Sequence, residues 1–218
     1  MDSVSPIVLT CPLLSVTLSF CSFCNLLKDR VKKDIFADEG GAGTSQSTSL
    51  ASQPCIGGSA GGYPCSNVDL LSFTPLSTFG SAEANDVWGW TDTGSGREFA
   101  IIGLVDGTGF VEISDPVNPV YLGKLASTNG ISSSWRDIKV YSNHAFIGSE
   151  ASGHGMQVFD LTLLLTAVPS SSFTPITTYT GVGSSHNIVI NEDSGFAYIV
   201  GSNQCAGGLH MVDISTPT

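Results

Sequence analysis

Short apolar runs recur three times, in the same order, over the C-terminal part of the chain. The three units open with runs at Asp86–Trp90, Asp137–Tyr141 and Asn187–Asn191, which start 51 and 50 residues apart. Second runs follow at Glu98–Gly103, His144–Gly148 and Phe196–Gly201. Third runs follow at Gly109–Ile113, Gly155–Leu161 and Gly208–Ile214, and fourth runs at Pro119–Leu125 and Pro175–Tyr179. A period near 50 residues with four short strands per unit predicts an all-β fold built from β-propeller blades.

The predicted domain spans residues 55–218 and holds about three four-stranded blades, at about 82–130, 131–181 and 182–218, of which the last is incomplete. Closed propellers have roughly 4–8 blades. Blades bury their faces against one another, so a shorter stack leaves an apolar face exposed at each end. We therefore expect a partial propeller. It is a fragment of a longer protein, a chain that assembles with other copies, or a poorly folded product.

The first 27 residues form an apolar leader, which we expect to be disordered or helical, and basic residues follow it. The apolar centre is what a secretory signal needs, but nothing basic precedes it and it has no evident cleavage site. Three interpretations stay open: an imperfect signal peptide, a membrane anchor, or a leader without a structural role, such as one from a misplaced start codon. Residues 28–54 end in a Gly/Ser/Thr-rich stretch that predicts a flexible linker.

The charge of the chain narrows the classes of partner. The net charge is −11, and from Ala51 onward 14 acidic residues stand against 4 basic ones. An acidic surface without a basic patch argues against nucleic acid and anionic membranes as partners. Contact with a membrane is then expected only through the leader or through a missing anchor. The same acidity is compatible with a bound divalent cation.

Two cysteines lie close enough in the chain to form a bridge. Cys55 and Cys65 flank a Gly-rich stretch, and a disulfide between them is expected in an oxidising compartment; two unpaired thiols are the alternative. Cys205 has no evident partner. Cys21 and Cys24 have a CxxC spacing, but no second pair lies at the spacing of a zinc site.

The third run of each unit is followed by an aspartate, at Asp115, Asp160 and Asp213. An aspartate there accepts backbone N–H bonds in the turn that leads to the outer strand. We interpret these three residues as structural.

These phrases resemble a known repeat. GLHMVDIS, GMQVFDL and GFVEISDPVNP are similar to the repeat named for the pattern Leu-Val-Ile-Val-Asp, and the run from PCSNVDLLS through ANDVWGWTD, SSWRDIKVY and SHNIVINEDSGFAYIVG to CAGGLHMVDIS resembles the choice-of-anchor B family of surface proteins. The resemblance runs from about Cys55 to Thr218. It implies an exported chain with a propeller-like domain that is attached to the cell surface at its C-terminus. It implies location more than activity, and we expect the later blades and the C-terminal anchor of that family to be missing from this chain.

The innermost strand of each blade lines the channel of a propeller, and its first residues are polar here. They are Asn85-Asp86, Arg136-Asp137 and His186-Asn187. If the units superpose, these pairs ring one mouth of the channel, where Asp86, Asp137 and His186 are a candidate site for a divalent cation such as calcium. A metal-bound water there would perform hydrolysis. The alternative is that these side chains satisfy backbone groups of neighbouring blades, with Arg136 paired to Asp86 or Asp137.

The aromatic and remaining histidine residues give weaker signals. Trp88, Trp90 and Trp135 lie near blade starts and are expected to pack between sheets, while a ligand-stacking role at the channel mouth is the alternative for one of them. His154, between two glycines, is expected to be exposed in a turn. No GxSxG, HExxH or P-loop pattern occurs, so no catalytic residue is assigned.

Three hypotheses for function remain. The first is an exported, extracellular or cell-surface propeller that binds a protein or a glycan and is not an enzyme. The second is a metal-dependent hydrolase at the channel mouth. The third is a truncated product without function, whose unpaired strand edges would favour aggregation.

Overall fold

The computed structural model describes residues 51–217, and strands account for most of their regular structure. The predicted all-β class is confirmed: the strands form four sheets, none of which closes on itself. The predicted leader and the linker up to residue 50 lie outside the described residues. In the described part, no helix is long and apolar enough to cross a membrane.

The first repeat unit forms a sheet close to the predicted one. Its four consecutive strands are β3 (Ala84–Thr91), β4 (Glu98–Leu104), β5 (Gly107–Glu112) and β6 (Val120–Ala126). They pair as antiparallel neighbours in chain order. A fifth strand, β10 (Ser171–Phe173), comes from the second unit and adds to β6 in parallel. The repeat pattern did not predict this crossing strand, because three residues carry no periodicity of their own.

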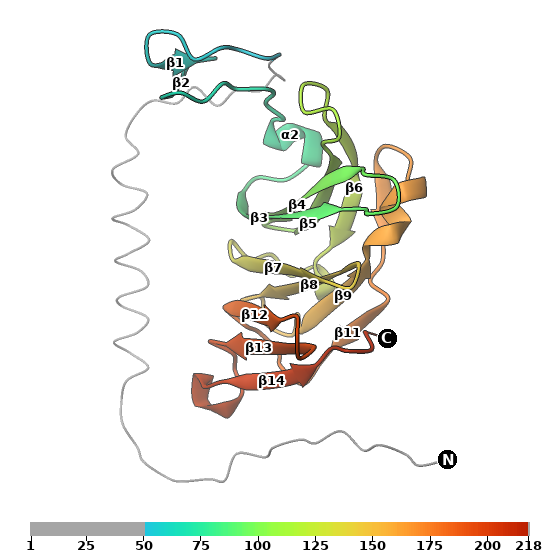
Figure 1. The fold of residues 1–218 in the computed structure, drawn as a ribbon. Helices are drawn as coiled ribbons and strands as arrows, with labels where there is room; N and C mark the ends of the chain where they lie inside the picture. Colours follow the sequence, from blue (N-terminus) through green and yellow to red (C-terminus); the bar gives the residue numbers. More distant parts are fainter. Residues whose placement is uncertain (1–50, 218) are drawn as a thin grey trace. The chain divides into compact units, whose positions relative to one another are not determined.

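The other two units form the next sheets. The second contains β7 (Arg136–Tyr141), β8 (His144–Ser149), β9 (Met156–Asp160) and β11 (Thr177–Tyr179). The third contains β12 (Asn187–Asn191), β13 (Phe196–Val200) and β14 (His210–Asp213). Short 3-10 turns η1 to η3 lie between strands, at Thr128–Gly130, Leu161–Thr166 and Cys205–Gly207. Figure 1 shows the three sheets following one another in chain order.

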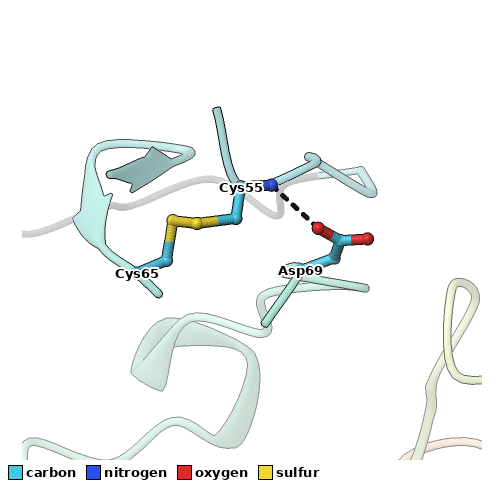
Figure 2. The surroundings of a disulfide bond; sticks show 3 residues. All are labelled: Cys55, Cys65 and Asp69. Atoms are coloured by element: carbon cyan, nitrogen blue, oxygen red, sulfur yellow. Dashed lines mark hydrogen bonds between the residues drawn. A yellow bond between two sulfur atoms is a disulfide. The ribbon is translucent and has the colours of Figure 1, made fainter. Parts of the chain in front are cut away.

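A small disulfide-bonded segment precedes the sheets. It contains β1 (Ser59–Ala60), β2 (Tyr63–Pro64) and the one-turn helix α2 (Leu76–Phe79). The predicted disulfide between Cys55 and Cys65 is present, and Asp69 accepts the Cys55 N–H at 2.8 Å (Figure 2). Backbone pairing begins at Gln53, which exchanges hydrogen bonds with Leu70, two residues before the predicted start of the domain.

Each pair of successive sheets encloses its own apolar core. Between the first and second sheets, Phe110 stacks on Phe159 with ring centroids 4.6 Å apart, and Phe173 of β10 packs edge-on against both rings. Between the second and third sheets the core is more aliphatic and is centred on Ile188 and Ile199. The second sheet is therefore buried on both faces, as a blade within a stack should be.

The predicted turn aspartates make the predicted bonds. Asp115, Asp160 and Asp213 each accept the backbone N–H of the residue two positions on, at 3.2, 2.9 and 2.9 Å. The position of the turn aspartate in the strand differs between the first two sheets. In the second sheet Asp160 pairs with His144. The equivalent pair in the first sheet is Glu112 with Phe99, and Asp115 follows three residues later. The repeat is thus offset at this edge, although the turn chemistry is the same.

Candidate functional site

Three sheets contribute residues to one shallow depression of about 190 Å³. Its lining consists of Asn85, Asp86, Trp135, Arg136, Asp137, His186 and Asn187. Six of these seven are the polar residues that the sequence predicted to ring one mouth of a channel, and the seventh is one of the three predicted tryptophans. The structure therefore brings the predicted set together.

The depression exists because the first strands of the three sheets lie beside one another: β3 contacts β7, and β7 contacts β12. Two glycines permit this close approach. A Cβ on Gly103 would lie 2.9 Å from Asn85 Oδ1 and 3.3 Å from Arg136 Cβ, and one on Gly148 would lie 2.7 Å from Ser185 Oγ. The shortest contacts are with the ends of the Asn85 and Ser185 side chains, so a larger residue at either glycine would displace side chains at the junction.

The two aspartates of the site bond to backbone groups of the following sheet. Asp86 Oδ2 accepts the Ile138 N–H at 2.8 Å, and Asp137 Oδ2 accepts the Ile188 N–H at 2.5 Å. The same bond thus recurs at both junctions between sheets. It satisfies a backbone donor that the strand pairing leaves open, which is the structural alternative expected from the sequence.

The two carboxylates differ in their surroundings. Asp137 is buried, and its second oxygen accepts a bond from Lys139 Nζ at 2.6 Å. Asp86 is only half-buried, and no cation neutralises it at ion-pair distance within the described part of the chain. Burial raises the pKa of the Asp86 carboxyl, and the negative charge of Asp137 raises it further.

Arg136 behaves differently from either expected pairing. Its Nε donates to Leu104 O at 2.6 Å, one terminal nitrogen donates to Val105 O at 3.4 Å, and the other lies 2.9 Å from His154 Nε2. Neither Asp86 nor Asp137 receives the guanidinium. Because the side chain is buried, desolvation lowers the pKa of Arg136 to about 10.

The exposed position predicted for His154 is wrong. The residue is fully buried, its Nδ1 lies 3.1 Å from Gly155 O, and its Nε2 faces Arg136. The two contacts define one tautomer: Nδ1 carries the proton and donates to the carbonyl, and Nε2 accepts from the guanidinium. Desolvation, with the charge of Arg136 adding to it, lowers the pKa of His154 to about 4. No sequence signal gave this, because the partner lies in another strand and Gly-His-Gly reads as a turn.

His186 forms the open side of the depression. Its Nδ1 lies 2.5 Å from Glu150 Oε1, and both side chains are partly exposed. The half-buried ring of Trp135 is 6.3 Å from the His186 ring, centroid to centroid. A hydrogen-bonding pair beside an indole face can hold a polar, ring-shaped or planar group.

The three predicted tryptophans have three different environments. Trp90 is in the core, where it stacks on Phe99 at 5.1 Å and donates to Asn143 Oδ1 at 3.2 Å. Trp88 lies under Lys139 Nζ, 4.6 Å from the ring centre, and does not line the depression. Of the three, Trp135 alone lines the depression.

The predicted metal residues lie in the depression, but Asp86, Asp137 and His186 each already bond to another group. Among residues 51–217, no group of three or more His, Cys, Asp or Glu side chains is arranged to hold a metal ion. Binding at Asp137 would compete with both Lys139 and the Ile188 N–H. The calcium site from Asp86, Asp137 and His186 stays a prediction.

Comparison of the chain with family models, with characterised proteins and with solved structures gave no match.

Proposed function

We propose that this chain is an exported, extracellular binding module, built on the plan of a β-propeller, that holds a protein or glycan ligand at the depression and catalyses no reaction. The observation that carries the proposal is that the residues of the depression fall into two groups. Asp86 and Asp137 bond to backbone N–H groups, whereas Trp135, His186 and Asn187 form a surface that a ligand can reach.

The size of the depression defines what can enter. Sites for whole small molecules usually measure roughly 300–1,000 Å³. A space of about 190 Å³ suits one part of a larger ligand, such as a single sugar ring or one side chain of a protein. Tryptophan offers rigid contact area at low entropic cost, which is why it is frequent at the centre of binding surfaces.

Two further features support the extracellular part of the proposal. The Cys55–Cys65 disulfide is the kind of bond that persists in oxidising compartments. The acidic surface disfavours nucleic acid. Together with the sequence resemblance to surface proteins, they favour an exported module.

The test is a binding screen of the purified chain against panels of glycans and extracellular proteins, followed by affinity measurement with two tryptophan variants. Trp135→Ala should weaken binding at least about ten-fold, because it removes the apolar face of the site. Trp88→Ala is the matched control, since this indole is also partly exposed but lies outside the depression. It should leave affinity unchanged. Absence of any ligand in both panels, or equal losses in the two variants, would contradict the proposal.

A further inference from the structure

The third sheet has one buried and one open face. Its residues Ile188, Ala197 and Ile199 point to the second sheet and are fully buried. The alternate positions are exposed and largely apolar: Val189, Val200, Leu209 and Met211. Since successive side chains in a strand point to opposite faces, these residues share the face that turns away from the second sheet.

Strand register shows what this face corresponds to. In the second sheet Phe146 pairs with Val158 across β8 and β9, and both are buried against the third sheet. In the third sheet the matching pair is Tyr198 and Met211, and Met211 is 48% exposed. The open face of the third sheet therefore corresponds to the face of the second sheet that packs against the third.

A repeated hydrogen bond joins each sheet to the next, and we call the side chains that accept it the relay residues. The series of relay residues ends at the open face of the third sheet. Asp86 and Asp137 each accept an N–H from the next sheet, and the third residue in this series is Asn187. Within residues 51–217 its side chain makes no hydrogen bond. An asparagine oxygen can accept the same bond from a strand N–H.

The opposite end of the stack also has an exposed apolar position, on β3. Val87 occupies the position of Ile138 and Ile188, one residue after the relay residue, and is 62% exposed where both isoleucines are fully buried. Helix α2 covers this side of the first sheet through Phe79, which packs with Leu104 of β4, Val111 of β5 and Tyr121 of β6. Val87 on β3 stays exposed beside it.

We propose that two copies of this chain associate head to tail, with the open face of the third sheet of each copy packed on the Val87 side of the first sheet of the other. Each contact places Asn187 of one copy against the strand that carries Val87 in the other, as Asp86 and Asp137 lie against the next strand within the chain. Two copies supply six main sheets, a number within the range of closed propellers, roughly 4–8. Head-to-tail contacts between identical chains form a ring when the rotation closes.

This inference rests on the propeller arrangement proposed above and is independent of the ligand. A failed ligand screen would leave it standing, and a monomer that binds a ligand would overturn it alone.

The test is the mass of the full 218-residue chain in solution, measured by sedimentation across a concentration series. The pair should have twice the 22.6 kDa of one chain. Met211→Asp and Val87→Asp each place a charge in a contact that should be apolar, and each should weaken self-association at least about ten-fold. Val168→Asp is the matched control: Val168 is 67% exposed, belongs to neither end and should leave the pair intact.

Mixing the two end variants identifies the geometry. The Val87→Asp chain keeps a native third sheet and the Met211→Asp chain keeps a native first sheet. The mixture should therefore form a heterodimer through one intact contact at concentrations where neither variant alone is a dimer. If two third sheets paired with each other instead, Val87→Asp alone would still dimerise.

Three results overturn the proposal. The first is a monomer at every concentration, and the second is formation of open polymers without a closed dimer. The third is a dimer that neither end variant weakens, which is what association through the apolar leader would give. Dimerisation of the Val87→Asp chain by itself also overturns it.

Discussion

Arg136 and His186 occupy the same place in two successive junctions between sheets. Each stands directly before the relay residue of its strand, and each reaches back to the end of the second strand of the preceding sheet. Arg136 bonds there to the carbonyls of Leu104 and Val105, whereas His186 bonds to the Glu150 side chain. The side chain of Arg136 is buried, and that of His186 is 42% exposed.

The difference shows how one repeat produces a structural junction and a candidate binding surface. At the first junction a long side chain fills the space, and neutral carbonyls and His154 satisfy its donors. At the second, a shorter ring and a carboxylate leave room beside Trp135. A buried polar network stabilises only when every member is satisfied, while an exposed pair contributes little to folding and is available to a ligand.

Arg136→Met should produce the largest loss of stability. The change removes the donors for two carbonyls and for His154 Nε2 while keeping most of the apolar stem. Leaving buried acceptors unpaired should lower the free energy of unfolding by about 3 kcal/mol. Urea denaturation followed by far-UV circular dichroism measures it. A loss below about 1 kcal/mol would show that the guanidinium is not integral to the first junction.

Acidification should weaken the same junction through His154. Its folded pKa is about 4, against 6.5 for the free side chain, so below pH 6.5 the unfolded chain takes up a proton that the folded chain excludes. The free energy of unfolding should therefore fall by about 2–3 kcal/mol between pH 6.5 and pH 4 and level off below that. The facing charges are Arg136, which adds to the effect, and Asp106, which acts on Arg136.

The control for this pH dependence is His154→Gln, which keeps a polar side chain but does not titrate. Its denaturation midpoint should change little over the same window. The raised pKa of Asp86 works in the opposite direction, because the folded chain then binds a proton more readily than the unfolded chain as the pH falls. Equal slopes in the parent and the variant would remove His154 as the cause.

The fold followed from the sequence wherever periodicity was strong. The period of the runs gave the first three strands of every unit, because alternation and turn residues define them locally. Strand β10 was not predicted, since Ser171–Phe173 is ordered by its pairing with β6 and not by its own pattern. The propeller itself stays a proposal, because the described sheets do not close.

The site was predictable as a location but not as chemistry. Superposing the repeats was enough to bring together residues around Asp86, Asp137 and His186, because equivalent strand starts meet at one end of stacked sheets. Whether each of these side chains binds a ligand, binds a metal ion or accepts a structural hydrogen bond depended on its partners from other sheets. The Ile188 N–H, which donates to Asp137, is an example. His154 shows the same limit, because its partner Arg136 lies on another strand.

Asp137→Ala should have a smaller effect than Arg136→Met and a larger one than Asp86→Ala. Asp137 is buried and accepts from both Ile188 N and Lys139 Nζ, so its loss should lower the free energy of unfolding by about 2 kcal/mol. Asp86 is more exposed and has one such backbone partner, so about 1 kcal/mol is expected. Parallel urea titrations measure both. The reverse order would mean that the relay bond at the first junction contributes more than the one at the second.

Calcium titration by calorimetry tests the metal prediction at the same residues. If the ion binds there, Asp137→Ala should abolish the heat of binding, and the wild-type chain should gain stability in excess calcium. Titration without heat, in a chain that is folded by circular dichroism, would assign the two aspartates to the relay alone.

His186→Ala should have the smallest effect on folding. The pair with Glu150 is partly exposed on both sides, and such pairs contribute roughly 0–1 kcal/mol. The change should therefore leave the urea midpoint almost unaltered while it removes one polar wall of the depression beside Trp135. A ligand found in the binding screen should lose affinity in this variant without a loss of stability, and Arg136→Met should show the converse wherever the protein is still folded. Stability that falls as far in His186→Ala as in Arg136→Met would mean that both junctions are structural, and that the exposure of His186 does not mark a binding surface.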